Sequence, residues 1–211
     1  MTAVSGSGPA YVFHLVEALA AAGAAAGLPA DVALRLARAT VEGSGELMFR
    51  DAQTMELKNS LVVDCRGVDH MDFTADGRFL IASCEFSGVV LKVDVAAQKV
   101  VGKLLIDPKA MPQDVKTSPD GKVFYVADMM SNGVHLVEPD SFTKIGFIPT
   151  GKGAHGLYVS RDSKVMYVSN RGEGSVSLIE LATRKVSRLP MRARSGESSL
   201  RSFQALDQCL R

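Results

Sequence analysis

Residues 114–146 read "DVKTSPDGKVFYVADMMSNGVHLVEPDSFTKIG", and this stretch sets the pattern for most of the chain. Short runs rich in Val, Tyr and Phe alternate with turn residues, first Asp120-Gly121 and then Asn132-Gly133. Runs of this kind, bounded by Asp-Gly and Asn-Gly, are typical of β-strands joined by tight turns. The stretch therefore predicts an antiparallel sheet of four short strands.

The same pattern occurs once before this stretch and once after it. Residues 70–102 read "HMDFTADGRFLIASCEFSGVVLKVDVAAQKVVG", and residues 156–188 read "GLYVSRDSKVMYVSNRGEGSVSLIELATRKVSR". Asp76, Asp120 and Asp162 take equivalent positions, 44 and 42 residues apart. Four antiparallel strands in about 43 residues are typical of one β-propeller blade. We expect an N-terminal α-helical pair followed by an all-β partial β-propeller of three four-stranded antiparallel blades.

The end of the second strand in each repeat carries a family resemblance. It reads "YVAD" at 125–128, "YVSN" at 167–170 and the degenerate "IASC" at 81–84. With these motifs, residues 57–190 resemble the YVTN-type β-propeller family. The resemblance implies a binding role for an unidentified protein or small-molecule ligand at the propeller face, and some members are periplasmic or secreted. Asp128 and Asn170 end this strand, where a side-chain oxygen can bind the backbone of the turn.

Candidate site residues follow from the same register. In a propeller, the innermost strand of each blade lines the central channel, so we expect His70, Asp114 and His155 to converge at one channel mouth. Imidazole and carboxylate groups there could hold a metal ion or a polar ligand. The alternative is that they form hydrogen bonds between neighbouring blades, which we favour because no two share a short metal-ligand spacing. We therefore predict no metal site and no catalytic residues, and we expect His135 to face solvent from its strand.

The first fifty residues follow a helical pattern. Residues 2–48 read "TAVSGSGPAYVFHLVEALAAAGAAAGLPADVALRLARATVEGSGELM". Apolar residues at helical spacing predict one helix from Pro9 to about Gly27 and a second from about Pro29 to Met48. Together the two helices have more apolar surface than they can bury against each other.

This segment resembles the start of the dimerisation domain of pyrroline-5-carboxylate reductase, in which NAD(P)H reduces pyrroline-5-carboxylate to proline beside an interlocked helical dimer. The resemblance implies a homodimer through residues 9–48, with Leu15, Val16 and Leu19 near its centre. It also implies a substrate loop formed by the five residues Ser5, Gly6, Ser7, Gly8 and Pro9, for which the alternative is a tight turn with close helix packing.

A bound cofactor, NADP, is expected only on the basis of that resemblance. No nucleotide-binding pattern precedes residue 2 and the family's later substrate loop is not found, so we expect no cofactor and no reductase activity from these residues alone. Two function classes stay open. One is a non-catalytic binding or scaffold module built on propeller blades. The other is a truncated member of the reductase family, inactive as this chain.

Composition limits the partners and the location. The formal net charge of +1 argues against binding to nucleic acid, and His14 and Glu17 interrupt the N-terminal apolar run, so we expect no membrane segment. Three cysteines without CxxC spacing predict reduced thiols. We expect a cytoplasmic location, with a periplasmic or secreted one as the alternative. The expected domains are a helical segment at 1–50, three blades at 51–190 and a basic, loosely ordered tail at 191–211.

Overall fold

The structure is a computed structural model that describes residues 8–34 and 45–191, of which side chains are described from residue 17 onward. The chain divides into two compact units, Met1–Val68 and Asp69–Arg211. We describe each unit by itself. The expected domain limits at residues 50 and 190 stay predictions.

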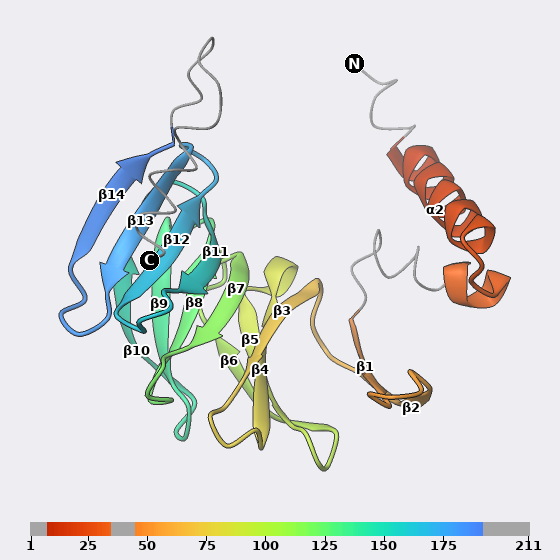
Figure 1. Cartoon of the computed structure of the whole chain (residues 1–211), viewed down its shortest axis with the longest axis horizontal. Coiled ribbons are helices and arrows are strands. Elements are labelled where there is room, and N and C mark those ends of the chain that lie inside the picture. The colour runs from red at the N-terminus through yellow and green to blue at the C-terminus, as the bar shows by residue number, and fades with distance from the viewer. Residues whose placement is uncertain (1–7, 35–44, 192–211) are drawn as a thin grey trace, which may run out of the picture. The chain divides into compact units, whose positions relative to one another are not determined.

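The first unit begins with helix α2, Gly8–Ala25 (Figure 1). The helix ends in a Schellman motif: the N–H of Leu28 donates to the carbonyl of Gly23 at 3.1 Å, and that of Gly27 donates to Ala24 at 3.0 Å. Gly27 adopts a φ of 96°, which only glycine tolerates well. Helical residues resume at 30–34. Ser5, Gly6 and Ser7 of the predicted substrate loop lie outside the described residues.

A β-hairpin follows, where the sequence predicted the end of a helix. Strand β1, Glu46–Arg50, pairs antiparallel with β2, Leu57–Val62. The prediction of helix up to Met48 is therefore wrong. Asp51 closes the turn, because its Oδ1 accepts the N–H groups of Gln53 and Thr54 at 2.9 and 3.0 Å. Lys58 forms an ion pair with Asp51 at 2.6 Å, and with these contacts it lowers the pKa of that carboxyl to about 2.

The second unit contains three four-stranded antiparallel sheets (Figure 1). The first sheet has β3 (Val68–Phe73), β4 (Phe79–Cys84), β5 (Val89–Asp94) and β6 (Lys99–Leu105), with a short 3-10 helix at Glu85–Ser87. The second has β7 (Pro112–Thr117), β8 (Phe124–Asp128), β9 (Gly133–Glu138) and β10 (Thr143–Pro149). The third has β11 (Ala154–Val159), β12 (Val165–Asn170), β13 (Ser175–Glu180) and β14 (Val186–Pro190). In each sheet the strands lie side by side in chain order, so every connection is a hairpin.

The turn between the first two strands has the same chemistry in all three sheets. Asp120 Oδ1 accepts the Ser118 hydroxyl at 2.6 Å and the Lys122 N–H at 3.2 Å. The hydroxyl bond comes first among the causes that lower the pKa of Asp120. Asp76 with Thr74 and Asp162 with Ser160 repeat this arrangement. The predicted turns at these three aspartates are confirmed.

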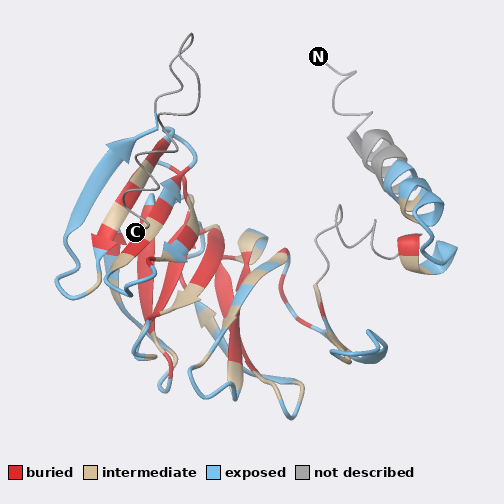
Figure 2. Ribbon diagram, in the orientation of Figure 1, coloured by how far each residue is buried: buried red, intermediate tan, exposed pale blue. Residues whose placement is uncertain are grey.

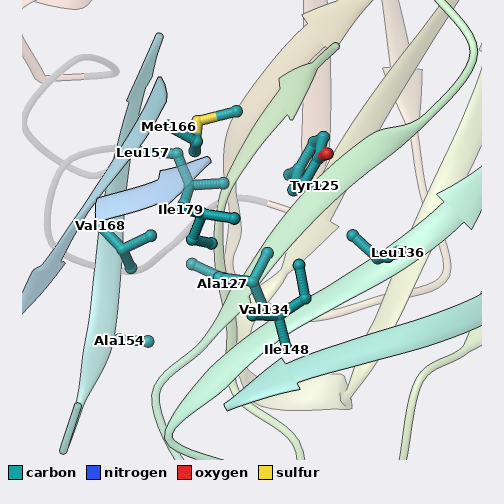
Figure 3. Packing of buried hydrophobic residues seen from close by; sticks show 10 residues of the cluster. All are labelled: Tyr125, Ala127, Val134, Leu136, Ile148, Ala154, Leu157, Met166, Val168 and Ile179. Atoms are coloured by element: carbon teal, nitrogen blue, oxygen red, sulfur yellow. The ribbon is translucent and has the colours of Figure 1, made fainter. Parts of the chain in front are cut away.

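The core of the second unit lies between neighbouring sheets. One cluster joins the second and third sheets, and Figure 3 shows its side chains meeting from both: Tyr125, Ala127, Val134, Leu136, Ile148, Ala154, Leu157, Met166, Val168 and Ile179. A second cluster joins the first and second sheets through Ile81, Val90, Ile106, Ala110, Val115, Phe124, Val126 and Val137. Buried residues concentrate in the second and third strands of each sheet, whereas β14 is exposed along its length (Figure 2).

Candidate functional site

The structure brings the three predicted channel-mouth residues together. His70 lies on β3, Asp114 on β7 and His155 on β11, each near the start of the first strand of its sheet. His70 Nδ1 is 3.6 Å from Asp114 Oδ1, and the rings of His70 and His155 meet edge to face with centroids 6.2 Å apart. Both histidines are partly exposed. The cluster thus presents two imidazole rings to solvent beside the buried carboxylate of Asp114.

Asp114 is already engaged in contacts within the unit. Its Oδ2 accepts the N–H of Leu157 on the next sheet at 2.8 Å, and Lys116 Nζ lies 3.9 Å from Oδ1. Asp72 on β3 binds the N–H of Thr117 in the same way, also at 2.8 Å. These carboxylates therefore hold the first strands of adjacent sheets together. For Asp114, this agrees with the alternative expectation of hydrogen bonds between neighbouring repeats.

The geometry does not amount to a metal centre. Among residues 17–34 and 45–191, no group of three or more His, Cys, Asp or Glu side chains is placed to hold a metal ion. The His70–Asp114 separation of 3.6 Å is also longer than a hydrogen bond. The cluster can offer polar contacts to a ligand, and its use for that purpose stays a prediction.

A buried polar network that the sequence did not reveal lies at the end of β8. Asp128 is fully buried, and its Oδ1 accepts the N–H groups of Met111 and Met130 at 2.9 and 3.0 Å. Its Oδ2 contacts the Ser131 hydroxyl and lies 3.1 Å from His135 Nε2. Burial alone would raise the pKa of Asp128, but the hydrogen bonds from His135, Ser131 and Met111 outweigh it and lower that pKa to about 2.

His135 is buried, so the prediction that it faces solvent is wrong. Only 5% of the residue is exposed, and its ring packs against Phe147 with centroids 4.7 Å apart. Its Nδ1 is buried without a hydrogen-bond partner. Both faces of the second sheet are covered, so alternation along β9 does not separate an inner from an outer side.

Asn170, which matches Asp128 in the third sheet, makes the same kind of contact. Its Oδ1 accepts the N–H of Gly151 at 3.0 Å, and its Nδ2 donates to Ser175 and Ser177 at 2.9 Å each. We call the contacts made by Asp128 and Asn170 strand-end tethers, because each joins the end of the second strand to the segment before the first. Asp128 binds the backbone of its turn through Met130, as predicted, whereas the oxygen of Asn170 binds the N–H of Gly151 before β11 instead of its own turn.

Cys84 takes this position in the first sheet. Cys84 and Cys65 are both disulfide-bonded, which corrects the expectation of reduced thiols. Cys84 is fully buried and Cys65 nearly so. The sequence offered no CxxC spacing from which this state could be read.

Residues 151–156, "GKGAHG", match the GxGxxG spacing of nucleotide-binding loops, but their context differs. The motif leads into a β-strand rather than a helix, and its amides are occupied. The N–H of Gly151 donates to Asn170, that of Lys152 to Glu173, and that of Gly153 to Asn132. The loop therefore has no free run of amides there to bind a phosphate.

Comparisons with known proteins divide along the chain. The family model described as pyrroline-5-carboxylate reductase dimerisation matches residues 1–67. Pyrroline-5-carboxylate reductase of Glycine max is 38% identical over 99 residues, which cover 47% of this chain and 34% of that protein. The Mycobacterium leprae enzyme is 58% identical over 49 residues, covering 23% of this chain and 17% of its own length. The chain thus spans 34% or less of the length of these curated relatives.

A solved structure resembles a larger part of the chain. Hydrazine synthase of Kuenenia stuttgartiensis superposes with a TM-score of 0.54 and 26% sequence identity, over 65% of this chain and 38% of that one. None of the described helices has the length and apolar character needed to cross a membrane. The N-terminal part is thus similar to a reductase dimerisation domain, and a mainly antiparallel β region follows it.

Proposed function

We propose that the chain belongs functionally with the pyrroline-5-carboxylate reductases through its N-terminal part, which acts as a homodimerisation segment. The match of the dimerisation family model to residues 1–67 carries this proposal. Identities of 55–58% to several reductases over 47–49 residues support it. The segment brings two copies of the chain, and so two copies of the β unit, into one assembly.

Exposed apolar side chains of this segment support self-association. Leu19 on α2 is 38% exposed, and Leu28 and Leu34 are 41% and 39% exposed. A protein contact would remove these side chains from water, and a stable dimer needs about 1,000 Å² or more of buried surface. The predicted central residues Leu15 and Val16 lie in α2, where side chains are outside the described part of the chain.

Light scattering on the purified full chain tests the proposal. We expect a dimer mass at micromolar concentration and a monomer mass for Leu19→Asp and for Leu28→Asp. Leu105→Asp is the matched control, because Leu105 is an exposed leucine on β6 of the other unit. A wild-type protein that runs as a monomer would contradict the proposal.

Reductase chemistry is a second candidate, favoured by the 99-residue match to the Glycine max enzyme. That enzyme's name gives the substrate class, a pyrroline-5-carboxylate, and hydride transfer to it requires a bound nicotinamide cofactor. Gly8 and Pro9 open α2, where backbone N–H groups can favour an anion. Titration of NADPH, followed by its fluorescence, separates the two functions. Saturable binding that Ser7→Ala weakens would favour the reductase, and no binding would leave the assembly role.

For the β unit, we propose three propeller blades with a binding face at His70, Asp114 and His155. Three four-stranded sheets in chain order with a repeated first turn support this, as does the likeness to hydrazine synthase. Disulfide-bonded Cys65 and Cys84 favour an oxidising compartment, hence the periplasmic or secreted alternative over a cytoplasmic one. Loss of a ligand's binding in His155→Ala, with unchanged thermal unfolding, would test the face.

A further inference from the structure

A cleft of about 630 Å³ lies between the first sheet and the β9–β10 turn of the second. Its lining includes Phe79 and Lys92 from the first sheet, Val101 and Gly102 from β6, and Phe142 from the turn. It is separate from the His70–Asp114–His155 cluster, none of whose residues lines it. The cleft therefore needs an explanation of its own.

The ammonium of Lys92 is the unusual feature of this cleft. Lys92 is only 9% exposed, and its Nζ donates to the carbonyl of Pro139 at 2.6 Å and more weakly to that of Asp140 at 3.4 Å. The Nζ also lies 4.4 Å from the Phe79 ring centroid and 6.0 Å from that of Phe142. Within the described part of the chain, no carboxylate lies in ion-pair contact with Lys92, although the charge of Lys92 contributes to the lowered pKa of Glu138. Burying a cation without an anion in direct contact is costly.

The repeat provides an internal comparison for Lys92. Leu136 takes the equivalent place in the second sheet, paired across the strands with Gly146 as Lys92 is with Gly102. Leu136 is 1% exposed and packs in the core. The architecture is therefore satisfied by an apolar side chain at this position, and packing alone does not account for a lysine.

The Phe142 ring lies close to β6 beside the cleft. Gly102 lacks the Cβ that would lie 2.8 Å from the Phe142 ring, so the ring can approach β6. Phe142 has a φ of 51°, and the equivalent residues Gln98 and Arg184 of the other two sheets have φ values of 51° and 59°, so this conformation belongs to the turn that all three sheets share.

We propose that this cleft binds a small organic oxyanion with an apolar body, whose charged group contacts Lys92 Nζ. An ammonium has three N–H donors and the two carbonyls use two, so one remains for the anion. The rings of Phe79 and Phe142 and the side chain of Val101 supply the apolar surface. The lining also contains Asp94 and Asp140, but both are more exposed than Lys92, so water screens their charges.

Benzoate is the test probe, added to the ¹⁵N-labelled full chain and followed by NMR. We expect saturable shifts of the Gly102 and Ser141 amides, with a Kd on the order of 1–10 mM, the range for a ligand of this size. Benzyl alcohol has the same ring without the charge and should bind roughly tenfold more weakly. Inorganic phosphate, which lacks the apolar body, should also bind more weakly.

Lys92→Leu copies the second sheet, so we expect it to fold with an equal or higher melting temperature and to lose the benzoate shifts. Val101→Asp places a carboxylate at an exposed position of the lining and should weaken benzoate binding without affecting the fold. The proposal is overturned if benzoate shifts neither amide by 50 mM, if benzyl alcohol or phosphate binds as tightly, or if Lys92→Leu binds benzoate normally. If Lys92→Leu does not fold, the Val101→Asp variant and the comparison of benzoate with benzyl alcohol and phosphate still test the proposal.

Discussion

Replacing Asp128 by Asn should destabilise the second unit in a way that depends on pH. Asn keeps an oxygen to accept the N–H groups of Met111 and Met130, but it turns an NH₂ group toward Ser131 and His135. His135 Nε2 would then have to accept, which moves its proton to Nδ1. That atom is buried without a partner, so the change leaves an unsatisfied N–H group.

The magnitude follows from the pKa of Asp128, lowered from 3.8 to about 2. At about 1.4 kcal/mol per pKa unit, ionised Asp128 stabilises the folded state by about 2.5 kcal/mol at neutral pH. Because the folded pKa lies below the unfolded one, this stability is complete above about pH 4 and is lost as the pH falls through 2. An unsatisfied buried N–H group costs about 1–3 kcal/mol, which agrees in size.

Urea unfolding at pH 7, 4 and 2.5, followed by circular dichroism, measures this effect. We expect Asp128→Asn to lower the free energy of unfolding by about 2–3 kcal/mol at pH 7 and by clearly less at pH 2.5. Asp120→Asn is the matched control, because the Asp120 carboxylate is exposed and the amide oxygen can keep its turn contacts. A variant as stable as the wild type at pH 7, or a loss that is equal at pH 7 and 2.5, would refute the reasoning.

Two further predictions concern the first sheet and the cysteines. Gly88→Ala should destabilise the protein by about 1–3 kcal/mol, measured by thermal unfolding, because Gly88 has a φ of 66° and an added Cβ would meet the Asp107 carbonyl oxygen. Gly77→Ala, at a φ of 70° but in open space, should cost less. Cys65 and Cys84 should resist alkylation by iodoacetamide in denaturant until a reductant is added, as read by peptide mass spectrometry. Labelling of both without reductant would contradict the disulfide-bonded state.

The sequence predicted those parts of the fold that local chemistry determines. The turns at Asp76, Asp120 and Asp162 are made by residues two positions away, so their pattern is visible in any single repeat. The hairpin of β1 and β2 was missed because its pairing depends on residues up to sixteen positions apart, as between Glu46 and Val62. A helical pattern upstream hid the change to strand.

The sequence predicted only part of the candidate site. Register placed His70, Asp114 and His155 at one end of their strands, and the structure brings them near one another. The cleft was not visible, because it depends on Phe142 of one sheet approaching Gly102 of another. The spacing of residues along the sequence does not predict such a contact between two sheets.

The three repeats show which positions the architecture constrains and which it leaves to other uses. The end of the second strand is Cys84, Asp128 or Asn170, and every one of them is buried and bonded, so a contact is required there while its chemistry varies. The position of Lys92 and Leu136 differs, because an apolar residue is sufficient in one sheet and a charged one is buried in the other. Lys92 uses two of its three N–H groups on the Pro139 and Asp140 carbonyls, and the third is left for a ligand. For this reason the Lys92 cleft, rather than the strand-end tethers, is where binding should be sought first.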